Sequence, residues 1–177
     1  MGNNRYEKKT NSIREKIFQF VNESPGIRYR ELLRITGLTN GVLSYHLNFL
    51  DNSGKVRINR VNDRVTRYFS QDVPIDEFNL IGLFRQPTTR KIIIFISESG
   101  PCVFNDIVNH TTKVPSTISW HLSKLSDANI IKIRKQNEFK YYDIGINKLK
   151  LQNLLSKYKS SFTEKIVDDY VDMMNEF

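Results

Sequence analysis

Histidine and cysteine side chains are the first candidates for metal or catalytic chemistry in this sequence. The chain has a single cysteine, Cys102, and three histidines, His46, His110 and His121. A structural zinc site needs about four clustered nitrogen or sulfur ligands, which these scattered residues do not supply. The sequence also lacks a glycine-rich phosphate loop, paired catalytic carboxylates and a nucleophile beside a base. We therefore expect no metal, no cofactor and no enzymatic activity.

Two of the histidines belong to a pattern that the chain repeats. The pattern reads GVLSYHLNFL at 41–50 and STISWHLSKL at 116–125, 75 positions later. Its apolar positions are spaced i, i+3, i+4 and i+7, which is typical of one buried face of a helix. The buried stripes are Leu43, His46, Leu47 and Leu50 in the first copy, and Ile118, His121, Leu122 and Leu125 in the second. This placement predicts hydrogen-bonded core histidines instead of metal ligands.

The opposite face of each repeated helix carries small polar and aromatic side chains. No Asp or Glu occurs within either stretch. A solvated helix face without a function usually carries Glu and Lys. Small hydroxyl and amide groups, in contrast, suit close approach to phosphates and base edges. The outward residues are Asn40, Gly41, Ser44, Tyr45 and Asn48 in the first copy, and Pro115, Ser116, Thr117, Ser119, Trp120, Ser123 and Lys124 in the second.

Basic side chains flank both helices. The chain has a net charge of +8, and all of the excess lies in 12–70 (+5) and 85–145 (+4), because the other residues together carry −1. We expect contacts to double-stranded DNA from Arg28, Arg30, Arg60, Arg64 and Arg67 in the first copy, and from Arg134 and Lys135 in the second. Arg34, Arg57, Lys132 and Lys140 add to the same charge. Arginine-rich ribbons favour contacts to phosphate or to the minor groove. Ordinary surface charge remains the alternative interpretation.

The rest of each copy predicts the elements that position these residues. Apolar spacing indicates helices over about 12–22 and 87–97, followed by short helices over about 28–35 and 104–110. After each repeated helix, two strands with alternating apolar residues reverse near Asn62-Asp63 or near Asn137-Glu138. This order of three helices and a hairpin is that of a winged helix-turn-helix. The predicted fold class is mainly α with small β-hairpin wings (α+β), as two tandem domains.

The predicted domain organisation follows from this repeat. We expect a flexible N-terminus at 1–11, winged helices at 12–70 and 87–145, a linker at 71–86, and a helical tail at 146–177. Apolar residues in the linker predict that it packs against the repeats: Phe78, Leu80, Leu83 and Phe84. The tail has a long apolar stripe, a basic first half and an acidic second half, which suits an antiparallel partner helix. A single helix cannot bury such a stripe alone, so it lies on the chain's own repeats or on a second chain. The charge order favours the second chain, so the tail predicts a homodimer.

The composition limits the class of protein further. At 39% hydrophobic residues the chain can form packed cores, and a single cysteine permits no internal disulfide. No N-terminal signal peptide is recognisable, and the most apolar run, KIIIFI, is too short to span a bilayer. We expect a cytoplasmic protein that does not enter a membrane. Cys102 aligns with Ile27 and is interpreted as a small core residue.

Two strings carry a family resemblance, GIRYRELLRITGLTNGVLSYHLNFLDNSGKV and VPSTISWHLSKLSDANII. They resemble archaeal winged-helix transcription regulators of the ArsR/MarR-like type. The tandem arrangement with a helical tail resembles a euryarchaeal family of two-winged-helix proteins that includes the archaellum-expression activator of methanogens. The resemblance covers about residues 12–177 and implies DNA-binding regulation by the third helix and wing of each repeat. The two copies differ at the start of the repeated helix, where the first has Gly41 and the second has Ser116. Glycine weakens the start of a helix, so base contacts there could be weaker in the first copy.

Two other classes of function stay open. One is an enzyme or ligand sensor that uses a winged helix as an accessory, although no segment remains to house a catalytic domain. The other is a protein-interaction scaffold. Tandem winged helices also serve as protein-interaction scaffolds in chromosome or transcription complexes. An acidic or strongly apolar outer helix face would favour that class, and Tyr45 and Trp120 are the outward residues that leave room for it.

Overall fold

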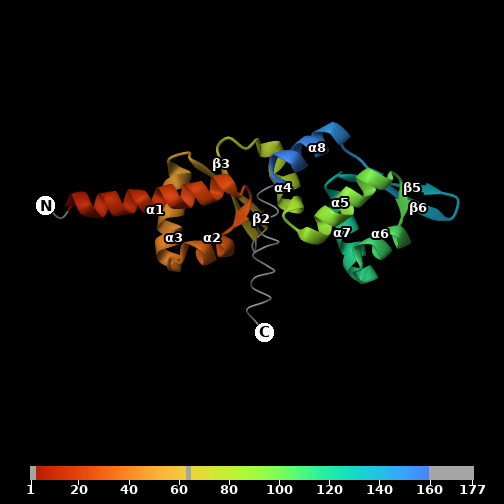
Figure 1. The fold of residues 1–177 in the computed structure, drawn as a ribbon, viewed down its shortest axis with the longest axis horizontal. Helices are drawn as coiled ribbons and strands as arrows, with labels where there is room; N and C mark the ends of the chain where they lie inside the picture. Colours follow the sequence, from red (N-terminus) through yellow and green to blue (C-terminus); the bar gives the residue numbers. More distant parts are fainter. Residues whose placement is uncertain (1–2, 63–64, 160–177) are drawn as a thin grey trace. The chain divides into compact units, whose positions relative to one another are not determined.

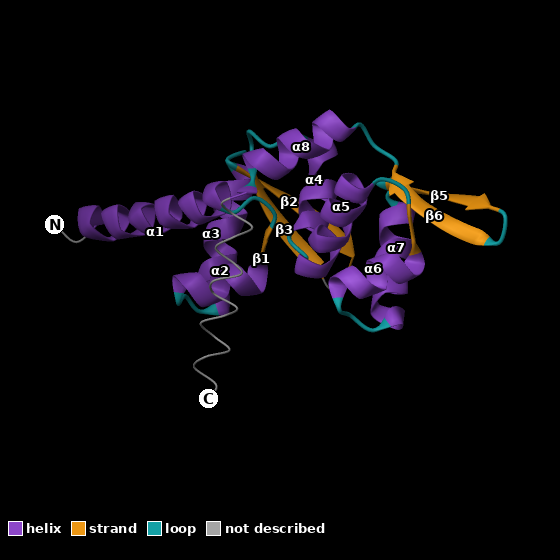
Figure 2. Ribbon diagram, turned by 45° about the vertical axis from the view of Figure 1, so that its right-hand side comes forward, coloured by secondary structure: helices purple, strands orange, loops and turns teal. Residues whose placement is uncertain are grey.

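The computed structural model describes residues 3–62 and 65–159, with side chains from residue 10 onward apart from 61 and 62. The chain divides into two compact units after Gly82. Each unit contains helices followed by an antiparallel hairpin (Figures 1 and 2). The predicted fold class, mainly α with small β wings in two tandem winged helices, is confirmed.

The first unit begins with three helices and a small sheet. Its elements are α1 (Asn3–Glu23), β1 (Ile27–Arg28), α2 (Tyr29–Thr36), α3 (Asn40–Asn52), β2 (Val56–Asn62) and β3 (Val65–Ser70). A 3-10 helix (Ile75–Glu77) and α4 (Phe78–Phe84) follow, and α4 crosses the point where the two units divide.

The second unit repeats this order of elements. They are α5 (Pro87–Ser99), β4 (Cys102–Val103), α6 (Phe104–Thr111), α7 (Pro115–Asp127), β5 (Ile131–Gln136), β6 (Phe139–Ile144) and α8 (Lys148–Lys157). In the part of the tail that the structure describes, Leu151, Leu154 and Tyr158 are buried, as the apolar stripe predicted. The remainder of the predicted tail, from 160 on, lies outside the described residues.

Helix α1 starts earlier than the sequence predicted. It begins at Asn3, whereas the prediction placed a flexible segment at 1–11 and the helix start near 12. The prediction was wrong for 3–11, because this segment contains no glycine or proline to interrupt a helix once it has started. The early part of α1 extends past α2 and α3 toward the N-terminus (Figure 1).

Each unit has a three-stranded sheet, where the sequence predicted only a hairpin. The strand orders are β1-β3-β2 and β4-β6-β5, and the added strand is antiparallel to the returning strand of the hairpin. The added strands follow Pro25-Gly26 in the first unit and Gly100-Pro101 in the second. Each is only two residues long, which is too short to show an alternating pattern of apolar and polar residues. Gly26 needs its positive φ of 76° here, and a Cβ would meet Phe69 at 3.2 Å.

The core of the first unit lies between the helices and one face of its sheet. Ile17 of α1, Leu32 of α2 and Leu43 of α3 are fully buried, and Tyr68 of β3 packs in the same core. Because neighbouring residues of a strand point to opposite faces, Phe69 lies on the other face. Phe78 of α4 stacks on Phe69 there, with ring centroids 3.8 Å apart. The predicted packing of the linker against a repeat is therefore confirmed for Phe78.

Candidate nucleic-acid interface

Helix α3 presents the predicted face to solvent. Its core stripe of Leu43, His46, Leu47 and Leu50 is buried. The predicted outward residues are all exposed: Asn40, Gly41, Ser44, Tyr45 and Asn48. The only acidic residue of the helix is Asp51, in its last turn. The prediction of which side chains face outward is confirmed, and a DNA-binding role for them remains a prediction.

Helix α7 has the same two faces. Ile118, His121, Leu122 and Leu125 are buried. Of the predicted outward residues, Thr117 is half-buried, and the rest are exposed: Pro115, Ser116, Ser119, Trp120, Ser123 and Lys124. The only acidic residue is Asp127, at the C-terminal end. The helix begins with Pro115 at its first position, which suits the fixed φ of proline.

The aromatic residue of each exposed face is held by a cation. The Lys124 ammonium lies 3.7 Å from the centroid of the Trp120 ring, which is 52% exposed. In the first unit, the Arg14 guanidinium lies 3.6 Å from the centroid of the Phe49 ring and 5.8 Å from that of Tyr45. These contacts fix the orientation of side chains on both helices and leave Trp120 half exposed for a partner.

The two core histidines differ in their hydrogen bonds. In the second unit, His121 Nδ1 lies 2.8 Å from Thr89 Oγ1, as the prediction of a hydrogen-bonded core histidine requires. In the first unit, Arg14 takes the place of Thr89, and His46 Nδ1 is buried without a partner among the described residues. For His46 the hydrogen-bond prediction was therefore wrong at this atom, because the repeat lost the hydroxyl that would satisfy it.

Burial lowers the pKa of both histidines. Desolvation is the larger cause in each case, and a nearby cation adds to it: Arg14 for His46, and Lys124 for His121. Both rings are consequently neutral at neutral pH. No group of three or more His, Cys, Asp or Glu side chains within residues 3–62 and 65–159 could hold a metal ion. Cys102 is buried, and desolvation is the main reason that its pKa is raised to about 11, so it remains a thiol.

The second wing exposes all four of its basic side chains, Lys132, Arg134, Lys135 and Lys140. In the pairing of β5 with β6, Lys135 lies directly opposite Lys140, next to the turn at Asn137. Like charges at opposed positions destabilise a hairpin, so this pair suits a wing that meets an anion. Arg134 is exposed as predicted, but its Nη2 forms an ion pair at 3.0 Å with Asp143, whose negative charge offsets that of the guanidinium. Lys140 is thus a stronger candidate than Arg134, and its register opposite Lys135 became visible only in the structure.

The first wing contains one predicted contact that the structure contradicts. Arg67 is only 3% exposed, so it cannot reach DNA. Its Nη1 donates to the Gly26 carbonyl at 2.8 Å and its Nη2 donates to the Gly82 carbonyl at 2.9 Å. The alternating pattern of the strand placed Arg67 on the face of the sheet that was expected to face solvent. The prediction failed because α4 covers that face. Arg60 is exposed, and Arg64 lies outside the described residues.

The two remaining predicted arginines lie before α3. Arg30 is exposed on α2. Arg28 is half-buried in β1 instead of in the short helix, and its backbone N–H donates to the Glu31 carboxylate at 3.3 Å. Arg30 is therefore the better placed of the two for an external phosphate.

Each unit thus combines three helices, an exposed third helix and a basic or polar wing, which is the arrangement of a winged helix-turn-helix protein. A profile described as "Bacterial regulatory protein, arsR family" matches residues 86–132, from α5 into β5. Two relatives are uncharacterised HTH-type transcriptional regulators of Methanocaldococcus jannaschii. One is 33% identical over 67 residues, which make up 38% of this chain and 75% of that protein. The chain belongs to the family of HTH-type transcriptional regulators.

The other relative is 23% identical over 133 residues, which cover 75% of this chain but 33% of that protein. The chain therefore spans about a third of the length of this longer regulator. A solved structure from Mycobacterium bovis, the homodimeric winged helix-turn-helix DNA-binding domain of a possible ArsR-family regulator, is 14% identical. It covers 55% of this chain and 83% of that chain, with a TM-score of 0.39. Among the described residues, none of the helices is both long and apolar enough to cross a membrane.

Proposed function

We propose that the chain is a transcription regulator that binds double-stranded DNA sequence-specifically through both of its winged helices. The observation that carries the proposal is on α7: its exposed face has no carboxylate before Asp127, and it is followed by a wing with Lys135 opposite Lys140. In this arrangement α3 and α7 enter major grooves and read base edges, while the wings contact phosphates.

The residues proposed to contact DNA are those that the structure leaves accessible. Near the first recognition helix they are Arg30, Asn40, Gly41, Ser44, Tyr45, Asn48 and Arg60, with Arg28 at the margin. Near the second they are Ser116, Thr117, Ser119, Trp120, Ser123, Lys124, Lys135 and Lys140, with Arg134 weakened by Asp143. Arg64 is retained from the sequence alone.

The proposal is tested by adding a carboxylate to the recognition face. Duplexes are first selected by the full chain from random DNA, and Kd is then measured by fluorescence anisotropy. Because a carboxylate beside phosphates is repelled, Ser119→Glu should weaken binding by about tenfold or more. Ser99→Glu makes the same change at an exposed position of α5 and should leave Kd unchanged. Equal affinity of both variants for the selected duplex would overturn the proposed reading role of α7.

We further propose a homodimer joined through the C-terminal segment, as the charge order of the tail predicted. Membership in the tandem two-winged-helix family that includes the archaellum-expression activator is likewise a proposal, supported by the repeated order of elements in both units. Sedimentation of the full chain at micromolar concentration tests the dimer, and a monomer there would exclude it.

A protein-interaction scaffold is the second candidate function. It is favoured by an apolar stripe on α3, where Val42, Tyr45 and Phe49 are all exposed at helical spacing. The corresponding residues of α7 are Thr117, Trp120 and Lys124, so the stripe is peculiar to the first unit. Failure of the full chain to retain any duplex in the selection would favour this second function.

A further inference from the structure

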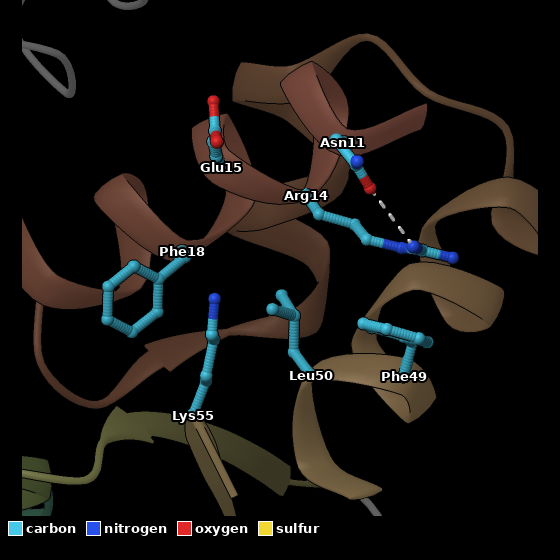
Figure 3. A pocket seen from close by; sticks show the side chains of 7 residues that line it. All are labelled: Asn11, Arg14, Glu15, Phe18, Phe49, Leu50 and Lys55. Carbon is cyan, nitrogen blue, oxygen red and sulfur yellow. Dashed lines mark hydrogen bonds between the residues drawn. The ribbon is translucent and has the colours of Figure 1, made fainter. Parts of the chain in front are cut away.

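The first unit has a hollow between α1 and the C-terminal end of α3 that the DNA-binding function does not use. Its volume is about 330 Å³. Figure 3 shows side chains of α1 and α3 around it, with Lys55 rising between Phe18 and Leu50. The lining residues are Asn11, Arg14, Glu15, Phe18, Phe49, Leu50 and Lys55. The size is at the lower end of ligand pockets, of order 300 Å³ and above, and suits one small organic molecule.

Two cations of the hollow lack a close hydrogen-bond or ion-pair acceptor within the described part of the chain. The Lys55 side chain is exposed at the mouth of the hollow and has neither an ion pair nor a hydrogen bond to those residues. Arg14 reaches Asn11 Oδ1 and the Tyr45 hydroxyl only at 3.4 Å each, and its Nε is buried without a partner there. A buried donor without an acceptor is costly, so an external acceptor at this point would be favourable.

The remaining lining residues complete an apolar wall with one acid at the rim. Phe18, Phe49 and Leu50 contribute rings and an aliphatic side chain. Glu15 is exposed, and in Figure 3 its carboxylate points away from Lys55. The interior of the hollow is therefore cationic beside apolar surface, while the single acid faces outward.

Comparison of the two repeats shows that this hollow is specific to the first unit. At the positions equivalent to Arg14, Phe18 and Lys55, the second unit has Thr89, Ile93 and Ile130, and all three are buried. These positions thus belong to the packed core in the second unit, whereas in the first unit two of them are cations that line the hollow. Neither cation is required by the fold, since the second unit forms the same fold without them.

We propose that this hollow binds an anionic small molecule, a carboxylate on a flat apolar body, with the anion between Lys55 and Arg14 and the body against Phe18 and Leu50. Charge-assisted hydrogen bonds from Lys55 and, once its side chain turns into the hollow, from the Arg14 guanidinium would hold the carboxylate. The apolar body would bury against the wall that is now half open.

The same site has a consequence for regulation, which rests on the proposed DNA-binding function. Arg14 stacks on Phe49 and lies near the Tyr45 ring, and Tyr45 is on the proposed DNA-reading face. An anion that draws Arg14 into the hollow would weaken these stacking contacts and change the presentation of Tyr45. The bound molecule would then act as an effector of DNA binding by α3.

Ligand binding is tested without DNA, so that its failure is distinguishable from failure of the proposed function. Isothermal titration calorimetry of the full chain uses 1-naphthoate as the anionic probe, 1-naphthamide as its neutral counterpart, and inorganic phosphate as an anion without an apolar body. We expect one 1-naphthoate per chain, with 1-naphthamide and phosphate each weaker by about tenfold or more.

Two variants locate the site, and each introduces the residue that the second unit has at the equivalent position. Lys55→Ile and Arg14→Thr should each weaken 1-naphthoate about tenfold, because each removes one charge-assisted contact. Lys16→Ile, an equal change on the exposed side of α1 outside the hollow, should leave binding unchanged. The proposal is overturned if 1-naphthoate does not bind the native chain, if both variants bind it as tightly as the native chain, or if 1-naphthamide or phosphate binds equally well.

Discussion

Residues of one wing can have opposite roles, as Arg60 and Arg67 show at the residue scale. Both follow the alternating pattern of the first hairpin, but Arg60 is exposed and Arg67 is buried under two backbone carbonyl contacts. The guanidinium of Arg67 also explains why residue 82 of α4 is a glycine, since an added Cβ there would lie 3.0 Å from Arg67 Nε. Arg67 thus connects three segments of its unit, so its role is structural.

Replacing Arg67 with methionine should destabilise the protein. The change leaves the carbonyls of Gly26 and Gly82 without these donors, and the expected loss in free energy of unfolding is ~2 to 3 kcal/mol. Arg30→Met makes the same change at an exposed position and should have little effect on stability. Urea unfolding followed by circular dichroism measures both, and equal stability of the two variants would contradict the structural role of Arg67.

The buried histidines predict that stability depends on pH. Because the folded-state pKa of His46 and of His121 lies below the usual 6.5, the unfolded chain binds more protons at mildly acidic pH. Their contribution is fully present above pH 6.5 and is lost as the pH falls below it. We expect the free energy of unfolding to fall between about pH 7 and about pH 5.

Substitution of single histidines identifies the source of this pH dependence. His46→Gln and His121→Gln should each reduce the slope of unfolding free energy against pH. Asn109→Gln, at an exposed position without a titratable group, is the control and should retain the slope. A slope that is the same in both histidine variants as in the native chain would show that other groups dominate.

At the scale of elements, the two repeats make the same turn before the recognition helix with different residues. After α2 the chain turns at Gly37 with φ of 63°, and after α6 it turns at Thr112 with φ of 57°. Glycine adopts this left-handed conformation at little cost, whereas a β-branched residue does so under strain. The turn before α7 is therefore less favourable than the turn before α3.

Exchanging these turn residues tests the difference. Thr112→Gly should raise the unfolding temperature, with a gain of about 1 kcal/mol in free energy of unfolding. Gly37→Thr is the mirror change, and since no other atom lies within 4 Å of its added Cβ, backbone strain alone should lower stability by a similar amount. Differential scanning calorimetry measures the unfolding temperature of both variants. A lower unfolding temperature for Thr112→Gly than for the native chain would contradict the proposed strain at Thr112.

For the whole molecule, helical periodicity and the internal repeat predicted most of the fold. The buried stripes of α3 and α7 and the outward residues opposite them follow directly from i, i+3 and i+4 spacing. The two-residue strands β1 and β4 were missed because so short a strand has no period. Strand alternation also says which face a residue takes but not what covers that face, which is why Arg67 was misplaced.

The hollow beside Arg14 and Lys55 could likewise not be predicted from the sequence. Its walls come from α1, the end of α3 and the residue before β2, and no local pattern joins these segments. The signal that could have indicated it is the difference between the repeats, since Lys55 aligns with Ile130 and Arg14 aligns with Thr89. A departure from internal symmetry at buried positions is thus a usable guide to a site.

Trp120 permits the most direct test of the central claim that α7 enters the duplex. It is the only tryptophan in the chain and is 52% exposed on the proposed reading face. Binding of the selected duplex is followed by anisotropy of labelled DNA, while acrylamide quenching of Trp120 is measured in the same titration. We expect quenching to fall in parallel with duplex binding and to saturate with it. A duplex that binds fully while Trp120 remains as accessible to acrylamide as in the free protein would contradict the claim that α7 enters the duplex.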